Sequence, residues 1–400
     1  MSVGTKKRAV VLMGAGAGLH LGAPRTRELT DHIRASVAEA DYHGQTVLQD
    51  AFQEIEDRLA EYLEQPSDVN FEHIYHVVHE LLKHMPHTKG AVNEFRPLLS
   101  PFFTSILHLD ERVLHRLATA ITDAIFACLT AASMAKPDTT TLATFIKTIR
   151  VDHTLRLYTT NYDDLVLQAA PDLYTGFVER DDGEPGQFDV DNFYQRQDTD
   201  GAFYLHGSVH FGFPPPNAAT KTGIGEIRWF RDPSVAKKFQ NGGTRSEART
   251  MDGMSVLRST VVTGLDKLNA LQAIPMAHFY QAFAQDVMLA DIIYVIGSGL
   301  SDLHLNVWLG QARSRSKPPV LVFVDFWVDG YEMPSGGRMS NKDVELFHRL
   351  KVHATREYSA MHPSRGWTIA GDKSAAIWDR GFDAFLKDPA QLHDVLALLV

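Results

Sequence analysis

Four continuously apolar segments constrain the fold of this chain more than any other feature of its sequence. They are RAVVLMG, TLRLYTTN, DIIYVIGSG and PVLVFVDF, at residues 8–14, 154–161, 291–299 and 319–326. Apolar runs without alternation are typical of parallel strands covered by helices on both faces. The first three runs lead into a glycine or polar turn and then a helical pattern. We therefore predict an α/β fold, a Rossmann-like parallel sheet with flanking helices and a ligand at the carboxyl ends of its strands.

A long helical region separates the first two predicted strands. Between residues 43 and 149, apolar residues recur every three or four positions, as in amphipathic helices. We predict that residues 1–42 and 150–330 form the core, that 43–149 is a large helical insertion, and that 331–400 is a C-terminal α/β extension packed on the core. Residues 180–250 are rich in Gly, Pro, Asn and Asp, which predicts mostly loop.

Charge and cysteine content argue against several classes of protein. The chain has 39 basic and 49 acidic residues, and its net charge of -10 disfavours direct binding to nucleic acid. Its single cysteine, Cys128, allows neither an intrachain disulfide nor a four-cysteine zinc site. No run reaches the roughly 18 uninterrupted apolar residues of a membrane span, and no signal-peptide cleavage pattern follows the first apolar run. We expect a cytoplasmic protein that does not bind a membrane.

The segment GAGAGLHLGAP, residues 14–24, follows the first predicted strand. It is not a phosphate-binding P-loop, because Gly18 is followed by Leu19 and His20 where that motif has Lys and then Ser or Thr. It also lacks the third glycine and the acidic residue of the dinucleotide fingerprint. Backbone amides at the start of a helix can still bind a pyrophosphate, and glycines allow close approach. The alternative is a turn that only packs the strand against the helix.

Polar side chains follow the ends of other predicted strands. Asn161 and Asp163 end the second apolar run, His206 follows the apolar stretch FYL, and the third run leads to Ser301 and Asp302. Each could be only a helix cap or a buried structural histidine. The carboxyl ends of parallel strands, however, face the ligand crevice. A histidine there, with an ordinary pKa of about 6.5, suits proton transfer.

Taken in order, the motifs G-A-G, T-x-N-Y-D, H-G and G-S-x-x-S-D resemble those of the sirtuin superfamily, specifically the sirtuin-like NADase domain of bacterial antiphage defence systems. The resemblance covers roughly residues 8–40 and 150–326. It implies three catalytic candidates, namely Asn161, Asp163 and His206. The NAD-binding candidates are Gly14, Ala15, Gly16, Gly18, Pro24, Thr160, Gly297, Ser298, Ser301, Asp302 and Asp325.

The resemblance also implies a role for each part of the site. The G-A-G loop contacts the pyrophosphate, and Asn161 and Asp163 line the nicotinamide and its ribose. His206 is the catalytic base. Gly297, Ser298, Asp302 and Asp325 hold the adenosine half.

The activity implied is that of an NAD+ glycohydrolase, which cleaves NAD to nicotinamide and ADP-ribose and depletes cellular NAD during phage infection. NAD is then the substrate, and no zinc is required. Relatives of this kind are held in homo-oligomers or joined to a second defence protein, such as a HerA-type motor ATPase or a short Argonaute.

Two departures from the family pattern leave alternatives open. Loops of this family often read G-A-G-A-S, whereas this chain has Gly18 in place of the serine. Sirtuin deacylases carry a four-cysteine zinc ribbon, which this chain cannot build, and this absence argues against deacetylation. The alternatives are a sirtuin-type deacylase, a protein ADP-ribosyltransferase and a non-catalytic NAD or ADP-ribose-binding sensor subunit.

Two further patterns favour ordinary explanations. The histidine-rich segment FEHIYHVVHELLKHMPH, residues 71–87, has Lys83 where the H-E-x-x-H motif needs its second histidine. A helix face at a subunit contact is favoured there over a metal site. The basic residues between 221 and 249 are typical of a solvated loop, with an active-site lid or a docking segment for an acidic partner as alternatives.

Overall fold

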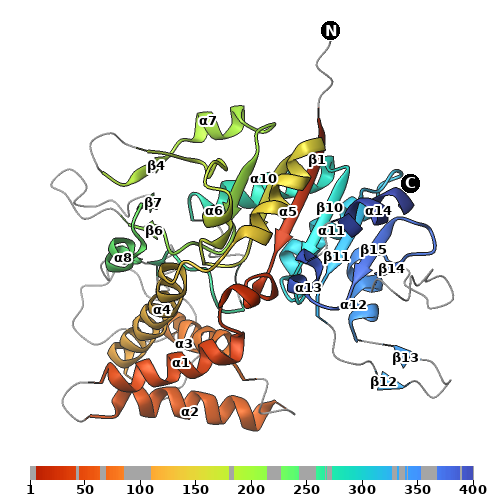
Figure 1. Ribbon diagram of the computed structural model, residues 1–400. Coiled ribbons are helices and arrows are strands. Elements are labelled where there is room, and N and C mark those ends of the chain that lie inside the picture. The colour runs from red at the N-terminus through yellow and green to blue at the C-terminus, as the bar shows by residue number, and fades with distance from the viewer. Residues whose placement is uncertain are drawn as a thin grey trace.

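The structure is a computed structural model, and Figure 1 shows the arrangement of its elements. The residues described are 6–41, 45–63, 69–84, 110–179, 184–213, 227–242, 258–265, 267, 273–326, 331–332, 338–339, 341–352, 367–387 and 390–399.

A seven-stranded sheet forms the centre of the fold, in the order β14-β15-β11-β10-β1-β2-β5. All neighbouring strands are parallel except β14 and β15, which are antiparallel. The strands are β1 (Lys7–Met13), β2 (His153–Thr159), β5 (Gly201–Tyr204), β10 (Ile292–Ile296), β11 (Val320–Val324), β14 (Trp367–Ile369) and β15 (Ala375–Trp378). The four apolar runs are the adjacent strands β11, β10, β1 and β2. The predicted α/β fold class, with a mostly parallel sheet, is confirmed.

Helices cover both faces of this sheet, which explains why its strands are apolar throughout. On one face, Val10 and Leu12 of β1 belong to a buried cluster with Phe279 and Leu305. On the other face, Val11 lies in a second buried cluster. The first face is covered by α10 (Met276–Leu289), α11 (Leu303–Arg313) and α12 (Asn341–Leu350), and the second by α5 (Thr140–Asp152), α6 (Leu165–Ala169), α13 (Phe382–Leu386) and α14 (Ala390–Leu398).

A helical bundle lies beside the carboxyl ends of the central strands (Figure 1). It consists of α1 (Thr26–Glu39), α2 (Val47–Tyr62), α3 (Phe71–His84) and α4 (Glu111–Met134). The stripe Leu29, Ile33 and Val37 of α1 is buried in the bundle core, whereas α5 packs on the sheet. The bundle therefore begins and ends earlier in the chain than the segment 43–149. The division of the chain into domains stays a prediction.

Among the described residues, α4 is the one helix whose length and composition would allow it to cross a membrane. Its most apolar window has a mean hydropathy of 1.6, and 56% of that window is buried. Leu117, Ile121 and Ile125 face the other three helices in the bundle core. The apolar character of α4 is thus accounted for by packing.

The part of residues 180–250 that the structure describes is more ordered than the predicted loop. It contributes to a four-stranded antiparallel sheet in the order β3-β4-β7-β6. The elements of this region and its surroundings are β3 (Phe177–Val178), β4 (Gly186–Phe188), α7 (Val190–Gln195), β6 (Phe211–Gly212), β7 (Arg228–Trp229), α8 (Pro233–Ala236), β8 (Asn241–Gly242) and β9 (Arg258–Ser259). Of the basic residues between 221 and 249, Lys221, Arg245 and Arg249 lie outside the described residues.

A buried ionic cluster ties β1 and β2 to α10. Arg156, only 1% exposed, donates from Nε to Asp286 Oδ2 at 2.7 Å, and the Tyr158 hydroxyl donates to the same oxygen. Arg8 donates from Nη1 to Asp286 Oδ1 at 2.6 Å, and from Nη2 to the exposed Asp198 at 2.6 Å. The Asp286 carboxylate accepts hydrogen bonds at both oxygens. Its negative charge thus balances the positive charges of Arg8 on β1 and Arg156 on β2.

Candidate active site

The carboxyl ends of β1, β2 and β10 and the loop after β5 surround one cavity of about 250 Å³. The predicted residues that line it are Gly14, Ala15, Pro24, Thr160, Asn161, Asp163, His206, Gly297, Ser298, Ser301 and Asp302. Gly16, Gly18 and Asp325 are not in the lining. The fold therefore gathers four motifs that are up to almost 300 residues apart in the sequence.

The glycines of the first loop pack directly against the loop that follows β10. The amide nitrogens of Gly14 and Gly16 donate to the carbonyl oxygens of Ile296 and Gly297, each at 2.9 Å. A Cβ atom on Gly14 would lie 2.7 Å from Gly297 O, and one on Gly16 would lie 2.9 Å from Gly297 Cα. The amides of Gly14 and Gly16 are therefore already used in hydrogen bonds within the protein. Gly16, which does not line the cavity, packs the first loop against the loop after β10. Ala15 is the member of the G-A-G motif whose amide has no described backbone acceptor.

The glycine at position 18 has a local physical reason. A Cβ atom there would lie 2.8 Å from Ala23 Cβ, so a serine requires the turn to shift. The same position would be 3.6 Å from Asp163 Oδ2. The loop thus folds back tightly between η1 (Ala15–Ala17), η2 (Leu19–Leu21) and the end of β2.

His206 is held rigidly in the loop after β5. Its carbonyl oxygen accepts from the Val262 amide at 2.8 Å, and Gly207 has a φ of +104° against the Thr260 carbonyl. His206 is 2% exposed, and its Nε2 atom has no hydrogen-bond partner among the described residues. Burial lowers the pKa of His206 to about 3, with Lys267 acting in the same direction. The expectation of a pKa near its ordinary value was wrong: the imidazole is neutral and has an unengaged nitrogen.

Asn161 and Asp163 lie at the end of β2. The Asn161 amide nitrogen of the backbone donates to Thr159 Oγ1 at 3.0 Å, and its side chain makes no hydrogen bond to another described residue. Asp163 Oδ1 accepts from the Leu165 amide at 3.2 Å. Burial raises the pKa of Asp163 to about 6. The site therefore presents a free carboxamide beside a carboxyl group that titrates just below neutrality.

A partly buried lysine, absent from the sequence predictions, joins the helical bundle to this site. Lys267 Nζ lies 2.9 Å from Asp302 Oδ1 and 3.1 Å from Glu72 Oε1 of α3. Burial alone would lower the pKa of Lys267, but the two carboxylates raise it. No nucleotide-binding or catalytic motif includes Glu72 or Lys267, and only their place in the lining of one cavity identifies them.

Of the two aspartates predicted to hold the adenosine half, Asp302 lines the cavity and Asp325 does not. Asp302 precedes α11 but makes no side-chain capping hydrogen bond, and it lies beside His206. Asp325, at the end of β11, accepts from the Phe326 amide at 2.9 Å and does not line the cavity. Their roles toward an adenosine group stay predictions.

Comparisons with known proteins give structural likeness only. No family model and no curated protein matches the chain. The solved structures similar to it include a Sir2 homologue in complex with NAD, with 14% identity over 99% of this chain and 91% of that chain and a TM-score of 0.37. A structure of Sir2 enzymes described for their mechanism and regulation has 13% identity over 85% of both chains and a TM-score of 0.37. A mutant Sir2 homologue in complex with ADP-ribose has 14% identity over 86% of this chain and 92% of that chain, with a TM-score of 0.34. These low scores do not assign the chain to a family.

Replacing Asp163 with asparagine should stabilise the protein at neutral pH. Because the folded-state pKa of about 6 exceeds the ordinary 3.8, the fold favours the protonated acid. The protonated Asp163 therefore adds to the stability of the fold. This added stability is fully present below pH 3.8 and is lost as the pH rises through about 6. Asparagine stays neutral at every pH. The unfolding free energy of the Asp163→Asn protein should therefore be about 2–3 kcal/mol higher than that of the wild type at pH 7.5. Near pH 4 the difference should be small.

Denaturant unfolding at the two pH values measures this difference. Asp152→Asn is the matched control, because Asp152 is exposed and its replacement should change the unfolding free energy little. An Asp163→Asn protein that is no more stable than the wild type at pH 7.5 contradicts the assignment.

Proposed function

We propose that this protein is an NAD+ glycohydrolase, which hydrolyses NAD to nicotinamide and ADP-ribose. The observation that carries the proposal is the convergence of Asn161, His206 and the two glycine loops on one cavity. Neither the neutral imidazole nor the free carboxamide is used by the fold for hydrogen bonding within the described residues. Groups left unpaired in a buried cavity are suited to a ligand.

The reaction breaks the bond between the nicotinamide nitrogen and ribose C1′. Nicotinamide leaves with the bonding electron pair, and the sugar passes through an oxocarbenium-like state that water attacks at C1′. Asn161 positions the water or a ribose hydroxyl without itself titrating. The water becomes strongly acidic as its oxygen bonds to C1′, so the neutral His206 can accept its proton even with a pKa of about 3. The carboxylates of Asp163 and Asp302 favour the positive charge that develops on the sugar.

We further infer an effector role in antiphage defence, through depletion of cellular NAD. This part of the proposal rests on the motif order alone. The same resemblance supports control by a homo-oligomer or by a second protein, such as a HerA-type motor ATPase or a short Argonaute, and a cytoplasmic location.

Blocking the cavity at Ala15 tests whether the ligand binds there. Ala15 is an exposed residue of the cavity wall, so Ala15→Trp fills the space without entering the core. We expect this variant to lose ADP-ribose binding by at least tenfold in isothermal titration calorimetry. Leu19→Trp is the matched control, because Leu19 is 38% exposed on the same segment and outside the lining. Equal affinity of Ala15→Trp and wild type would place the ligand elsewhere.

A further inference from the structure

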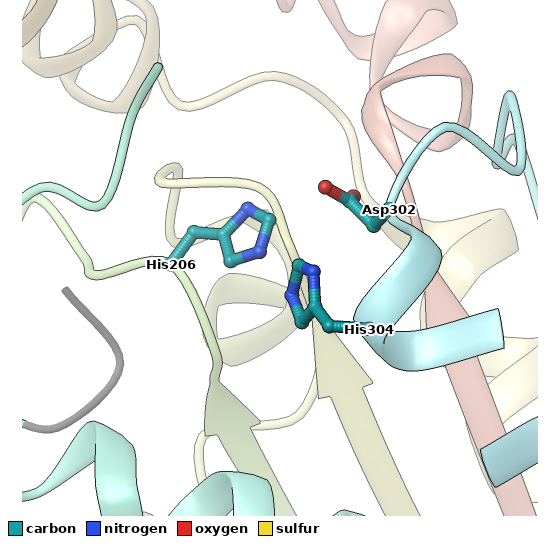
Figure 2. A group of neighbouring side chains, drawn as sticks. All are labelled: His206, Asp302 and His304. Carbon is teal, nitrogen blue, oxygen red and sulfur yellow. The ribbon is translucent and has the colours of Figure 1, made fainter. Parts of the chain in front are cut away.

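Three side chains beside the cavity form a group with the composition of a transition-metal site. They are His206 after β5, and Asp302 and His304 at the start of α11. One ligand atom from each lies within 4.8 Å of the other two. Figure 2 shows the two imidazole rings next to each other, with the Asp302 carboxylate at their side. The ring centroids are 5.8 Å apart, at an interplanar angle of 35°.

The nitrogen atoms in this group are left without partners by the fold. Nε2 of His206 and Nε2 of His304 are both buried and have no hydrogen bond to a described residue. An unpaired buried nitrogen costs about 1–3 kcal/mol, so these two nitrogens are available to a ligand that would pair with them. An imidazole nitrogen with a free electron pair is the common protein ligand for transition metals.

We propose that His206, Asp302 and His304 bind a divalent transition ion of the Zn²⁺ class. Two imidazoles and one carboxylate are a known three-ligand set for zinc, and the fourth position stays open. Zinc bonds of about 2.0–2.1 Å require ligand atoms roughly 3.3 Å apart. Side-chain rotation that moves the ligand atoms by up to about 1.5 Å in total brings the group to this spacing. This site differs from a four-cysteine ribbon and departs from the prediction that the chain has no metal site.

Lys267 sets the strength of this site. Its ammonium group contacts one Asp302 oxygen at 2.9 Å and therefore opposes a second cation nearby. The ion takes the other carboxylate oxygen. Because the metal occupies the nitrogen that His206 needs to accept a proton, metal binding is inhibitory; this consequence rests on the proposed function.

Zinc binding by the purified full-length chain tests the proposal without any use of NAD. Isothermal titration calorimetry with ZnCl2 should show one ion per chain for the wild type, and MgCl2 should show none because Mg²⁺ prefers oxygen ligands. His304→Asn should weaken zinc binding at least tenfold, and Lys267→Met should strengthen it. The exposed His32→Ala should bind as the wild type does. Thermal unfolding confirms that each variant is folded.

Unchanged zinc affinity in both His304→Ala and His304→Asn would overturn the site, as would absence of zinc binding by the wild type. Inhibition is measured separately as NAD cleavage with and without ZnCl2, and His304→Asn should resist it. If zinc binds as expected but NAD is never cleaved, the metal site stands and the proposed hydrolase activity fails.

Discussion

Replacing His206 with alanine is expected to reduce nicotinamide release from NAD by a factor of about 10²–10⁴, the usual contribution of a positioned general base. The imidazole is neutral, buried at the cavity wall and unpaired at Nε2, so this nitrogen is available to accept the proton. The change removes this acceptor and leaves the glycine loops and Asn161 in place. The variant should therefore still bind ADP-ribose.

The measurement is the initial rate of nicotinamide release by the wild type and by His206→Ala at equal concentration. His278→Ala is the matched control. His278 is a partly buried histidine on α10 that contacts Tyr194, and it does not line the cavity. The control should retain the wild-type rate. A His206→Ala protein with more than half of the wild-type rate would remove His206 from the mechanism.

Replacing Asp286 with alanine is expected to lower the unfolding free energy by about 3–5 kcal/mol, the range for breaking a buried ion pair. The variant leaves the guanidinium of Arg156 buried and without its carboxylate, and it removes the acceptor of the Tyr158 hydroxyl. It also removes one of the two carboxylates that bind Arg8. Arg8 lies on β1, and Arg156 and Tyr158 lie on β2, and both strands end at the cavity. The rate of NAD cleavage should therefore fall together with the unfolding free energy.

Asp198→Ala is the control, because it removes the other carboxylate bound to Arg8. Asp198 is 87% exposed at its side chain, so its loss should change the unfolding free energy by less than about 1 kcal/mol. Denaturant unfolding compares the two variants. Equal effects would mean that the buried cluster does not hold β1 and β2 to α10.

The sheet and the location of the site were predictable because short-range patterns encode them. In a strand such as RAVVLMG, residues 8–14, successive side chains point to opposite faces, so continuous apolarity indicates a doubly covered strand. That the helical bundle begins with α1 was harder to predict. The stripe Leu29, Ile33 and Val37 shows that α1 has one apolar face, but periodicity does not say which partner covers it. The small sheet was missed because its strands have two or three residues, too few to show a period.

The site followed from one rule, that parallel strands present their carboxyl ends at the same edge. This rule places Asn161 and His206 together. The rule does not predict Glu72 and Lys267 as site residues, because their ion pair joins two segments that no local sequence pattern connects. It also does not give the pKa of His206, since burial of the ring depends on the whole loop. The grouping of His304 with His206 likewise exists only in three dimensions.

The most direct test of the central claim is the fate of NAD labelled in its adenine when it is incubated with the purified full-length chain, alone and with the products of neighbouring genes. The proposed hydrolase predicts equal amounts of nicotinamide and free, labelled ADP-ribose, with no label on protein. Label transferred to protein would instead identify a transferase, and label in acyl-ADP-ribose, formed when an acylated peptide is added, would identify a deacylase. NAD that is bound but stays intact under all these conditions would contradict the claim and identify a binding subunit.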